Sequence, residues 1–154
     1  MAYWLLKTEP DEFSIDDLAA LGGRPERWNG IRNYQARNLL RDDIRVGDEA
    51  FIYHSSCKQV GIAGSATITR AAYPDPDQFD PESKYFDPKA SEDQPRWYCV
   101  DVVFAQKFPR VIPLAELKQH PELADMVLLK QGRLSVQPVT PREWQLIMQW
   151  SSTP

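Results

Sequence analysis

Two β-forming segments separated by a short link constrain the fold of this chain more than any other feature. Residues 49–54 (EAFIYH) and 60–72 (VGIAGSATITRAA) have the composition of strands, and residues 55–59 between them are mostly polar. A link this short predicts a hairpin, which makes the two strands antiparallel neighbours. Gly61 and Gly64 lie inside the second strand, where glycine weakens the pairing and marks a bulge or the close approach of another group.

Further strands and helices are predicted around this hairpin. Residues 2–7 (AYWLLK) form a short β-forming run that stops before Pro10, and residues 97–108 begin with WYCVDVVF, which predicts a central strand covered on both faces. Helices are predicted at 15–21, 34–41 and 142–150 with N-caps at Ser14, Asn33 and Thr140, and short helical turns at 113–120 and 121–128. Residues 73–96 hold five prolines and seven acidic residues, which predicts a long loop without a core of its own.

Together these elements predict an α+β fold, in which a mixed, mostly antiparallel sheet curls into a β-barrel with peripheral helices. The length of 154 residues fits one domain over residues 1–154. With 42% hydrophobic and 26% charged residues, a disordered, collagenous or coiled-coil chain is excluded. No apolar run approaches the ~20 residues of a membrane span, and Lys7 and Glu9 interrupt a signal-peptide pattern, so we expect a cytoplasmic protein without membrane contact.

Charge is distributed unevenly along the chain. The net charge of −4 argues against a non-specific nucleic-acid coat protein, but residues 73–101 alone hold eight acidic and three basic side chains. Between residues 24 and 45, six arginines stand against only three acidic residues. The sequence therefore predicts a local basic surface on an acidic protein.

The chain carries no motif of the common enzyme or metal-site classes. GxGxxG, P-loop, HExxH and GxSxG patterns are absent, as is an H-x-E followed by a cysteine pair. Cys57 and Cys99 lack CxxC spacing, so we expect packed thiols and no zinc site. A catalytic pair of His54 and Cys57 is disfavoured, because neighbours along a strand point to opposite faces. We therefore assign no catalytic residue, no metal ligand and no cofactor.

Residues 28–38 (WNGIRNYQARN) form the densest polar and aromatic segment. Two aromatic residues, two arginines and four amide side chains surround the start of a predicted helix, where free backbone N–H groups favour an anion or a polar ligand edge. Trp28 is predicted in a polar loop, and it is either a core residue or a platform on which a flat ligand stacks. Tyr34, Gln35 and Asn38 are equally well explained as helix surface and cap.

Four motifs in this order resemble one known family. They are YWLLKTEP at 3–10, WNGIRNYQARN at 28–38, FIYHS at 51–55 and RLSVQP at 133–138, and together they resemble the EVE domain family over nearly the whole chain. The resemblance implies a PUA-like fold, akin to the YTH domains that recognise methylated adenine in RNA. It also implies a pocket for a modified nucleobase, with modified cytosine such as 5-methylcytosine in DNA as the expected ligand.

The resemblance also implies which residues form this pocket. The residues expected to bind the nucleobase are Trp28, Asn29, Gly30, Ile31, Arg32, Asn33, Tyr53, His54 and Ser55. Those expected at the rim or against phosphate, by resemblance or as part of the basic surface, are Lys7, Glu9, Arg37, Arg133, Ser135 and Gln137. Trp28 is implied to be the wall of an aromatic cage. Residues 84–87 and 96–97 also match the family pattern, although their place relative to the pocket does not follow from the sequence.

These observations lead to one main hypothesis and two alternatives. We expect a non-catalytic reader that binds a modified nucleobase, in DNA in preference to RNA, with moderate selectivity, because a methyl group in an apolar pocket contributes only ~1–3 kcal/mol. The alternatives are a pocket for a small anionic metabolite or nucleotide, and an enzyme that acts on a nucleobase. An accessible cavity beside Trp28 is the structural requirement, and we expect a buffer anion or ordered waters near Arg32, Asn33 and Ser55.

Overall fold

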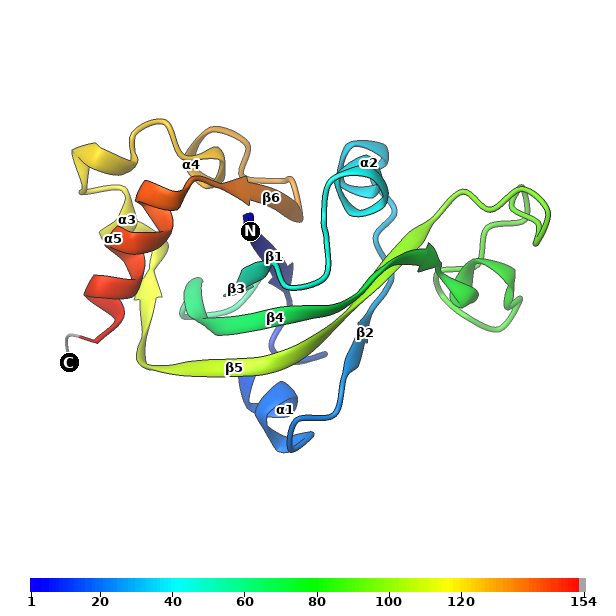
Figure 1. Cartoon of the computed structure of the whole chain (residues 1–154), viewed down its shortest axis with the longest axis horizontal. Helices are drawn as coiled ribbons and strands as arrows, with labels where there is room; N and C mark the ends of the chain where they lie inside the picture. Colours follow the sequence, from blue (N-terminus) through cyan, green and yellow to red (C-terminus); the bar gives the residue numbers. More distant parts are fainter. Residues whose placement is uncertain (153–154) are drawn as a thin grey trace.

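The computed structural model describes residues 1–152, which are organised around a twisted six-stranded sheet (Figure 1). The strands are β1 (Tyr3–Thr8), β2 (Glu26–Trp28), β3 (Glu49–His54), β4 (Gly61–Pro74), β5 (Tyr98–Pro113) and β6 (Val136–Val139). They lie in the order β2-β5-β4-β3-β1-β6. β1 and β3 are parallel, and every other pair of neighbours is antiparallel. The predicted hairpin is confirmed as β3 and β4, and the sheet is mixed and mostly antiparallel as expected.

The sheet is bent but not closed. β4 and β5 are long strands whose register shifts at several points along their ladder, which increases the local twist (Figure 1). β2 and β6 form the two edges, and no pairing joins them within the described residues, so the α+β class is confirmed and the barrel is not. A Cβ on Gly61 or Gly64 would collide with a carbonyl oxygen of β5. The close approach that these glycines predict is made by the neighbouring strand.

Helices cover both faces of the sheet (Figure 1). They are α1 (Ile15–Ala20), α2 (Tyr34–Asp42), α3 (Leu114–Leu117), α4 (Val127–Lys130) and α5 (Pro141–Ser151), with 3-10 turns η1 (Pro76–Phe79) and η2 (Pro121–Leu123). The side chains of Ser14, Asn33 and Thr140 each accept a backbone hydrogen bond at the start of α1, α2 and α5. All three predicted N-caps are therefore confirmed.

Alternation along the strands divides the apolar side chains between two cores. Trp4 and Leu6 of β1 belong to the core that also contains Leu18 of α1 and Leu40 of α2. Leu5 points to the other face, into the second core, which α3, α4 and α5 cover. Because β1 and β3 are parallel and in register up to their last residues, the segments that follow them start side by side.

Two predictions about the strands are corrected. The sequence places Trp28 in a polar loop, but residues 26–28 form β2, with Trp28 opposite Val100 of β5. A strand of three residues is too short to show alternation, and it exists because β5 offers an edge for pairing. β5 itself runs past the predicted end at residue 108 to Pro113, and residues 105–107 are exposed, so it is covered on both faces only in part.

Two further features bear on possible chemistry. Cys99 is buried, which raises the pKa of its thiol to about 12, and Cys57 is half-buried. Across residues 1–152, no helix combines the length and the apolar character that crossing a membrane requires. In the same part of the chain, no three His, Cys, Asp or Glu residues come together in a group that could hold a metal ion.

Candidate functional site

A cavity of about 840 Å³ opens where the ends of β1 and β2 and the segment after β3 meet the segment before β6. Small-molecule sites in proteins usually have volumes of about 300–1,000 Å³. The parallel pairing of Thr8 with His54 at the ends of β1 and β3 brings Glu9 and Ser55 to the same rim. The lining residues are Lys7, Thr8, Glu9, Glu12, Phe13, Glu26, Arg27, Trp28, Asn29, Gly30, Ile31, Arg32, Ser55, Ser56, Lys84, Tyr85, Gly132, Arg133 and Ser135.

The motifs that are separate in the sequence converge on this cavity. Of the residues expected to bind the nucleobase, Trp28, Asn29, Gly30, Ile31, Arg32 and Ser55 line it, and of the expected rim residues, Lys7, Glu9, Arg133 and Ser135 line it. The structure places the others, Asn33, Arg37, Tyr53, His54 and Gln137, outside the lining. Each of these five has contacts elsewhere that account for its position.

Two of the five are buried at the end of β3. The ring of Tyr53 belongs to the second core, where burial raises its pKa to about 12, and the ammonium group of Lys7 lies 5.2 Å from its centre. The Nε2 atom of His54 accepts a hydrogen bond from the backbone N–H of Ile15 at 3.1 Å. Burial lowers the pKa of this imidazole. His54 is therefore held as a neutral acceptor that supports the start of α1.

The other three have structural contacts in different places. Gln137 is fully buried and donates through Nε2 to two backbone carbonyls of the segment before β6. Asn33 is exposed and caps α2 by accepting a hydrogen bond from the N–H of Ala36 at 2.9 Å. Arg37 donates to the carbonyl oxygen of Arg96 at 2.8 Å and does not line the cavity.

Trp28 is at once a core residue and part of the cavity wall. Only 6% of the residue is exposed, and its ring meets the ring of Phe13 edge-on with the centroids 6.1 Å apart. Both aromatic residues also border the cavity. Trp28 is therefore confirmed as a core residue, and its role as a platform for a flat ligand stays a prediction.

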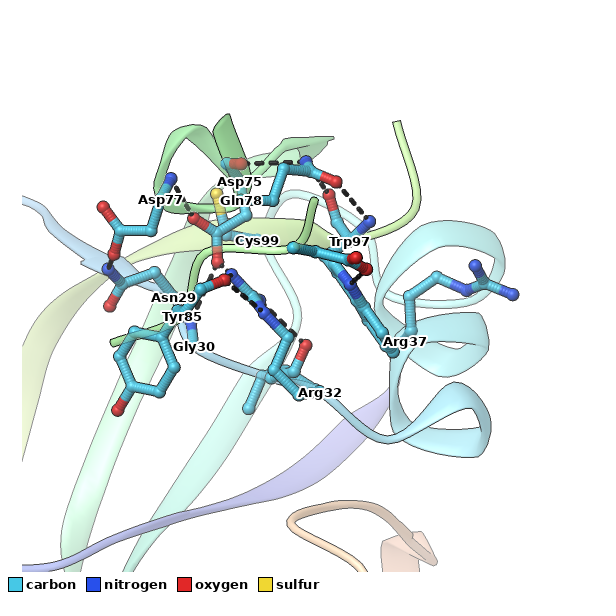
Figure 2. Close-up of polar contacts among 12 residues, drawn as sticks. Asn29, Gly30, Arg32, Arg37, Asp75, Asp77, Gln78, Tyr85, Trp97 and Cys99 are labelled. Atoms are coloured by element: carbon cyan, nitrogen blue, oxygen red, sulfur yellow. Dashed lines mark hydrogen bonds and ion pairs between the residues drawn. The ribbon is translucent and has the colours of Figure 1, made fainter. Parts of the chain in front are cut away.

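Four hydrogen bonds within the protein hold the guanidinium group of Arg32. Its Nη1 atom lies 3.0 Å from the carboxylate of Asp75 and also donates to the carbonyl of Ile31. Its Nε and Nη2 atoms both donate to the carbonyl oxygen of Tyr85, at 3.1 and 2.9 Å (Figure 2). This guanidinium group therefore ties the cavity wall to the loop between β4 and β5.

Asp75 is the buried centre of this connection. Its side chain is fully buried, and besides Arg32 it accepts hydrogen bonds from the N–H groups of Gly30 and Asp77, each at 2.9 Å (Figure 2). Asn29 also donates to the carboxylate of Asp77. The acidic residues at the start of the loop, whose role does not follow from the sequence, thus hold residues 29–32 in place.

A second buried residue fixes the other end of the loop. Gln78 donates through Nε2 to the carbonyl oxygens of Asp75 and Trp97, both at 2.8 Å, and its Oε1 accepts from the N–H groups of Arg96 and Trp97 (Figure 2). All the hydrogen-bonding capacity of this amide is used. The predicted loop without a core is therefore anchored by polar contacts at both of its ends.

Tyr85 from the same loop supplies an aromatic wall that the sequence does not place. Its ring lies against Gly30, whose φ of +79° belongs to the left-handed region. Lys84 lies 5.1 Å from the centre of the ring and forms an ion pair with Glu12 at 2.7 Å. The match of residues 84–87 to the family pattern is the only signal in the sequence that points to this wall.

The lining carries charges of both signs. Arg32 and Lys84 are paired with carboxylates, and Arg27 and Arg133 are exposed at the rim. Burial lowers the pKa of Lys7, whose ammonium group donates to the carbonyl of Gly132. Three glutamates also line the cavity. Five basic and three acidic side chains thus line the cavity, and ion pairs reduce the charge that a ligand meets.

The cavity offers groups that can recognise a polar ligand. Trp28 and Tyr85 are aromatic residues of the lining, and the hydroxyl groups of Thr8, Ser55, Ser56 and Ser135 are donors and acceptors for a polar ligand. Among the described residues that line it there is no histidine and no cysteine. A nucleophile held by an imidazole base, as in many acyl transfers, is therefore absent from the described lining.

Comparison with known proteins gives consistent matches. The family model for the EVE domain matches residues 2–150. Thymocyte nuclear protein 1 of Homo sapiens is 43% identical, over 96% of this chain and 72% of that protein. The crystal structure of a Pseudomonas putida protein is 58% identical, with a TM-score of 0.93 over 97% of this chain and 99% of that one. The human THYN1 protein, solved in complex with 5-methylcytosine-containing DNA, is 42% identical, with a TM-score of 0.94 over 100% of this chain and 99% of that one.

Proposed function

This chain belongs to the EVE domain family, and we propose that it is a non-catalytic protein that binds DNA containing a modified cytosine, with the modified base held in the cavity beside Trp28. The observation that carries the proposal is the cavity itself, which has Trp28 and Tyr85 among its lining residues. The complex of the similar human protein with 5-methylcytosine-containing DNA supports the class of ligand.

The physical chemistry of the cavity is suited to a single flat heterocycle. Taking a base out of a DNA strand costs a few kcal/mol of stacking, which contacts with aromatic rings and hydrogen bonds to the base edge offset. The hydroxyl groups of Thr8, Ser55, Ser56 and Ser135 are the partners for that edge, since the N–H of Gly30 is already donated to Asp75. A 5-methyl group gains apolar contact worth ~1–3 kcal/mol, so the preference for the modified base is moderate.

Two observations support binding without catalysis and a base in place of a small anion. His54 lies near the cavity, but its imidazole accepts a hydrogen bond from the N–H of Ile15 and is not part of the described lining. The guanidinium of Arg32 is neutralised by Asp75, and three glutamates line the cavity. The lining therefore offers an enzyme no imidazole base, and the guanidinium group of Arg32 is already paired before a small anion could bind it.

The test is a comparison of binding to oligonucleotides that differ only at one cytosine. Fluorescence anisotropy is measured with matched DNA strands that carry 5-methylcytosine or cytosine, with an RNA strand of the same sequence, and with free nucleotides. We expect tighter binding to the methylated DNA by a factor of about 5–100. Equal affinity for the two DNA strands contradicts the proposal.

The same samples distinguish the alternatives. The strands are recovered after incubation and weighed by mass spectrometry, and we expect unchanged masses. A changed mass or a released base would indicate an enzyme. Free nucleotides that bind as tightly as a strand would indicate a metabolite pocket.

A further inference from the structure

A row of aromatic rings and guanidinium groups leads from the cavity to the surface. It starts at Tyr85 in the cavity wall, whose ring centre lies 5.3 Å from the Cζ atom of Arg32. The same Cζ atom lies 5.5 Å from the ring of Trp97, so Arg32 stands between the two rings (Figure 2). Trp97 in turn stacks on Tyr34, with ring centroids 4.8 Å apart and an interplanar angle of 29°.

The outer end of this row is formed by Tyr34, Arg37 and Arg96, which we call the outer platform. Tyr34 is the first residue of α2 and is 52% exposed. The Cζ atom of Arg37 lies 4.8 Å from its ring, and Nη1 of Arg96 donates to its hydroxyl group at 3.4 Å. Arg37 also donates to the carbonyl oxygen of Arg96 at 2.8 Å, which joins the two arginines.

Packing explains Trp97 but not the outer platform. Trp97 is buried, and its Nε1 atom donates to Asp87 at 2.8 Å. Tyr34 covers one face of that indole, and about half of its own surface stays exposed to water. The guanidinium groups of Arg37 and Arg96 lie beside this exposed ring. Within residues 1–152, neither Arg37 nor Arg96 has a carboxylate within ion-pair distance. Nε and Nη1 of Arg37 donate to Asn38 and to the carbonyl oxygen of Arg96, but no ion pair neutralises either guanidinium group, so both can still attract a phosphate.

Resting on the proposed function, we propose that the outer platform is a second contact site for nucleic acid, which takes a flanking nucleotide of the strand whose modified base is held in the cavity. The exposed ring of Tyr34 stacks on the neighbouring base, and Arg37 and Arg96 contact a phosphate. Stacking on an aromatic ring accepts any base, because every base has a π-face. A guanidinium group binds phosphate oxygens through paired N–H groups regardless of sequence.

The two sites therefore make different contributions to binding. The cavity distinguishes modified from plain cytosine, whereas the outer platform strengthens binding to both strands by the same factor. The phosphate contacts also make the contribution of the outer platform sensitive to salt. These differences allow the two sites to be tested separately on the same oligonucleotides.

The experiment compares Tyr34→Ala and the double variant R37Q/R96Q with the wild type at several salt concentrations. We expect Tyr34→Ala to weaken binding to methylated and plain single strands alike, by about tenfold. For R37Q/R96Q we expect the slope of log K against log salt to fall by about 0.7–0.9 for each phosphate group that the variant no longer neutralises. In both variants the ratio of the two affinities stays at the wild-type value.

Two further variants serve as controls. Tyr34→Phe keeps the ring and removes only the hydroxyl group, and we expect it to bind within about twofold of wild type. Arg142→Gln removes an exposed arginine at the start of α5, which lies on the other side of the sheet, and we expect unchanged affinity and salt slope (Figure 1). Thermal unfolding of every variant shows that the fold is intact. If Tyr34→Ala is unfolded, the affinity and salt slope of R37Q/R96Q alone test the outer platform.

The outcomes separate this proposal from the proposed function. A wild type that prefers the methylated strand, with Tyr34→Ala and R37Q/R96Q binding as tightly as wild type, overturns the outer platform and leaves the cavity proposal standing. Variants that lose the preference without losing overall affinity also overturn it. A wild type that binds both strands equally, with weaker binding by the variants, overturns the role of the cavity and supports the outer platform.

Discussion

The ring of Tyr85 lies so close to the backbone of Gly30 that a Cβ atom on the glycine would stand 2.6 Å from Cζ of the tyrosine. The two residues come from segments that are far apart in the sequence, and both border the cavity. Gly30 is also in the left-handed region, at a φ of +79°, which other residues adopt only with strain. The shape of the cavity therefore depends on the missing side chain at this position.

Gly30→Ala is expected to damage both stability and binding. The left-handed backbone alone costs about 1–2 kcal/mol with alanine, and displacement of the Tyr85 ring adds about 1 kcal/mol or more. Because the ring forms one wall of the cavity, affinity for the methylated strand falls as well. Urea unfolding and anisotropy measure the two effects. Gly22→Ala is the matched control, since Gly22 has a φ of +62° with no atom within 4 Å of its Cβ position. Equal losses of stability and affinity in the two variants would show that the Tyr85 ring moves aside at no cost to the fold or to binding.

Local sequence patterns predict the elements of this fold but not the contacts that shape its cavity. The caps at Ser14, Asn33 and Thr140 depend on neighbours within three residues, and all three are present. The β2 strand depends on pairing with β5, more than 70 residues later, and three residues carry no periodicity of their own. Its existence therefore could not be predicted from residues 26–28 alone.

The role of Arg32 illustrates the same limit for the site. Its position in a basic segment suggests a free cation, because only three acidic residues lie near it in sequence. The carboxylate that neutralises it, that of Asp75, belongs to the acidic segment, and the two charges meet only when β4 carries that segment back to residues 29–32. Charge patterns along a sequence show where charges are, but not which of them pair in the fold.

Trp28→Phe is expected to separate the two roles of the indole. A phenyl ring keeps much of the buried area, so we expect a loss of stability of about 1–2 kcal/mol. The stacking surface toward the cavity shrinks, so affinity for the methylated strand falls by about tenfold. Trp144→Phe is the matched control, because Trp144 is also 6% exposed but packs on Phe51 in the second core. It should lose stability to a similar extent and bind DNA as wild type. Unchanged binding by Trp28→Phe would contradict an indole wall.

Asp75→Asn is expected to release the loop between β4 and β5 from the cavity wall. The substitution leaves Arg32, whose side chain is only 21% exposed, without its counter-charge, and we expect a loss of about 2–4 kcal/mol in the free energy of unfolding. Residues 29–32 lose their anchor, so backbone amide exchange at Gly30 accelerates. Asp80→Asn, at an exposed residue of the same loop that also caps a backbone N–H, should change stability by less than about 0.5 kcal/mol. A similar loss in both variants would mean that burial of the Asp75–Arg32 pair has no special importance.

His54 makes the stability of the protein depend on pH. Burial lowers the pKa of its imidazole below the ordinary value of 6.5, against a weaker opposite effect of the Asp16 carboxylate. Its Nε2 atom also accepts the N–H of Ile15, which requires that nitrogen to be unprotonated. As the pH falls below about 6.5, the unfolded chain takes up a proton at this residue that the folded chain does not, so the folded state loses stability until the lower pKa is reached.

His54→Gln is expected to remove this pH dependence, because the amide oxygen of glutamine can accept the same hydrogen bond from Ile15 and does not titrate. Free energies of unfolding are measured with urea at pH 7.5, 6.5, 5.5 and 4.8 for both proteins, which brackets the ordinary pKa of histidine at about 6.5. The wild type should lose up to about 1.4 kcal/mol more per pH unit than the variant below pH 6.5, and the two should run parallel above it. Profiles that stay parallel over the whole range would assign the acid sensitivity to other groups, and would mean that folding does not lower the pKa of His54.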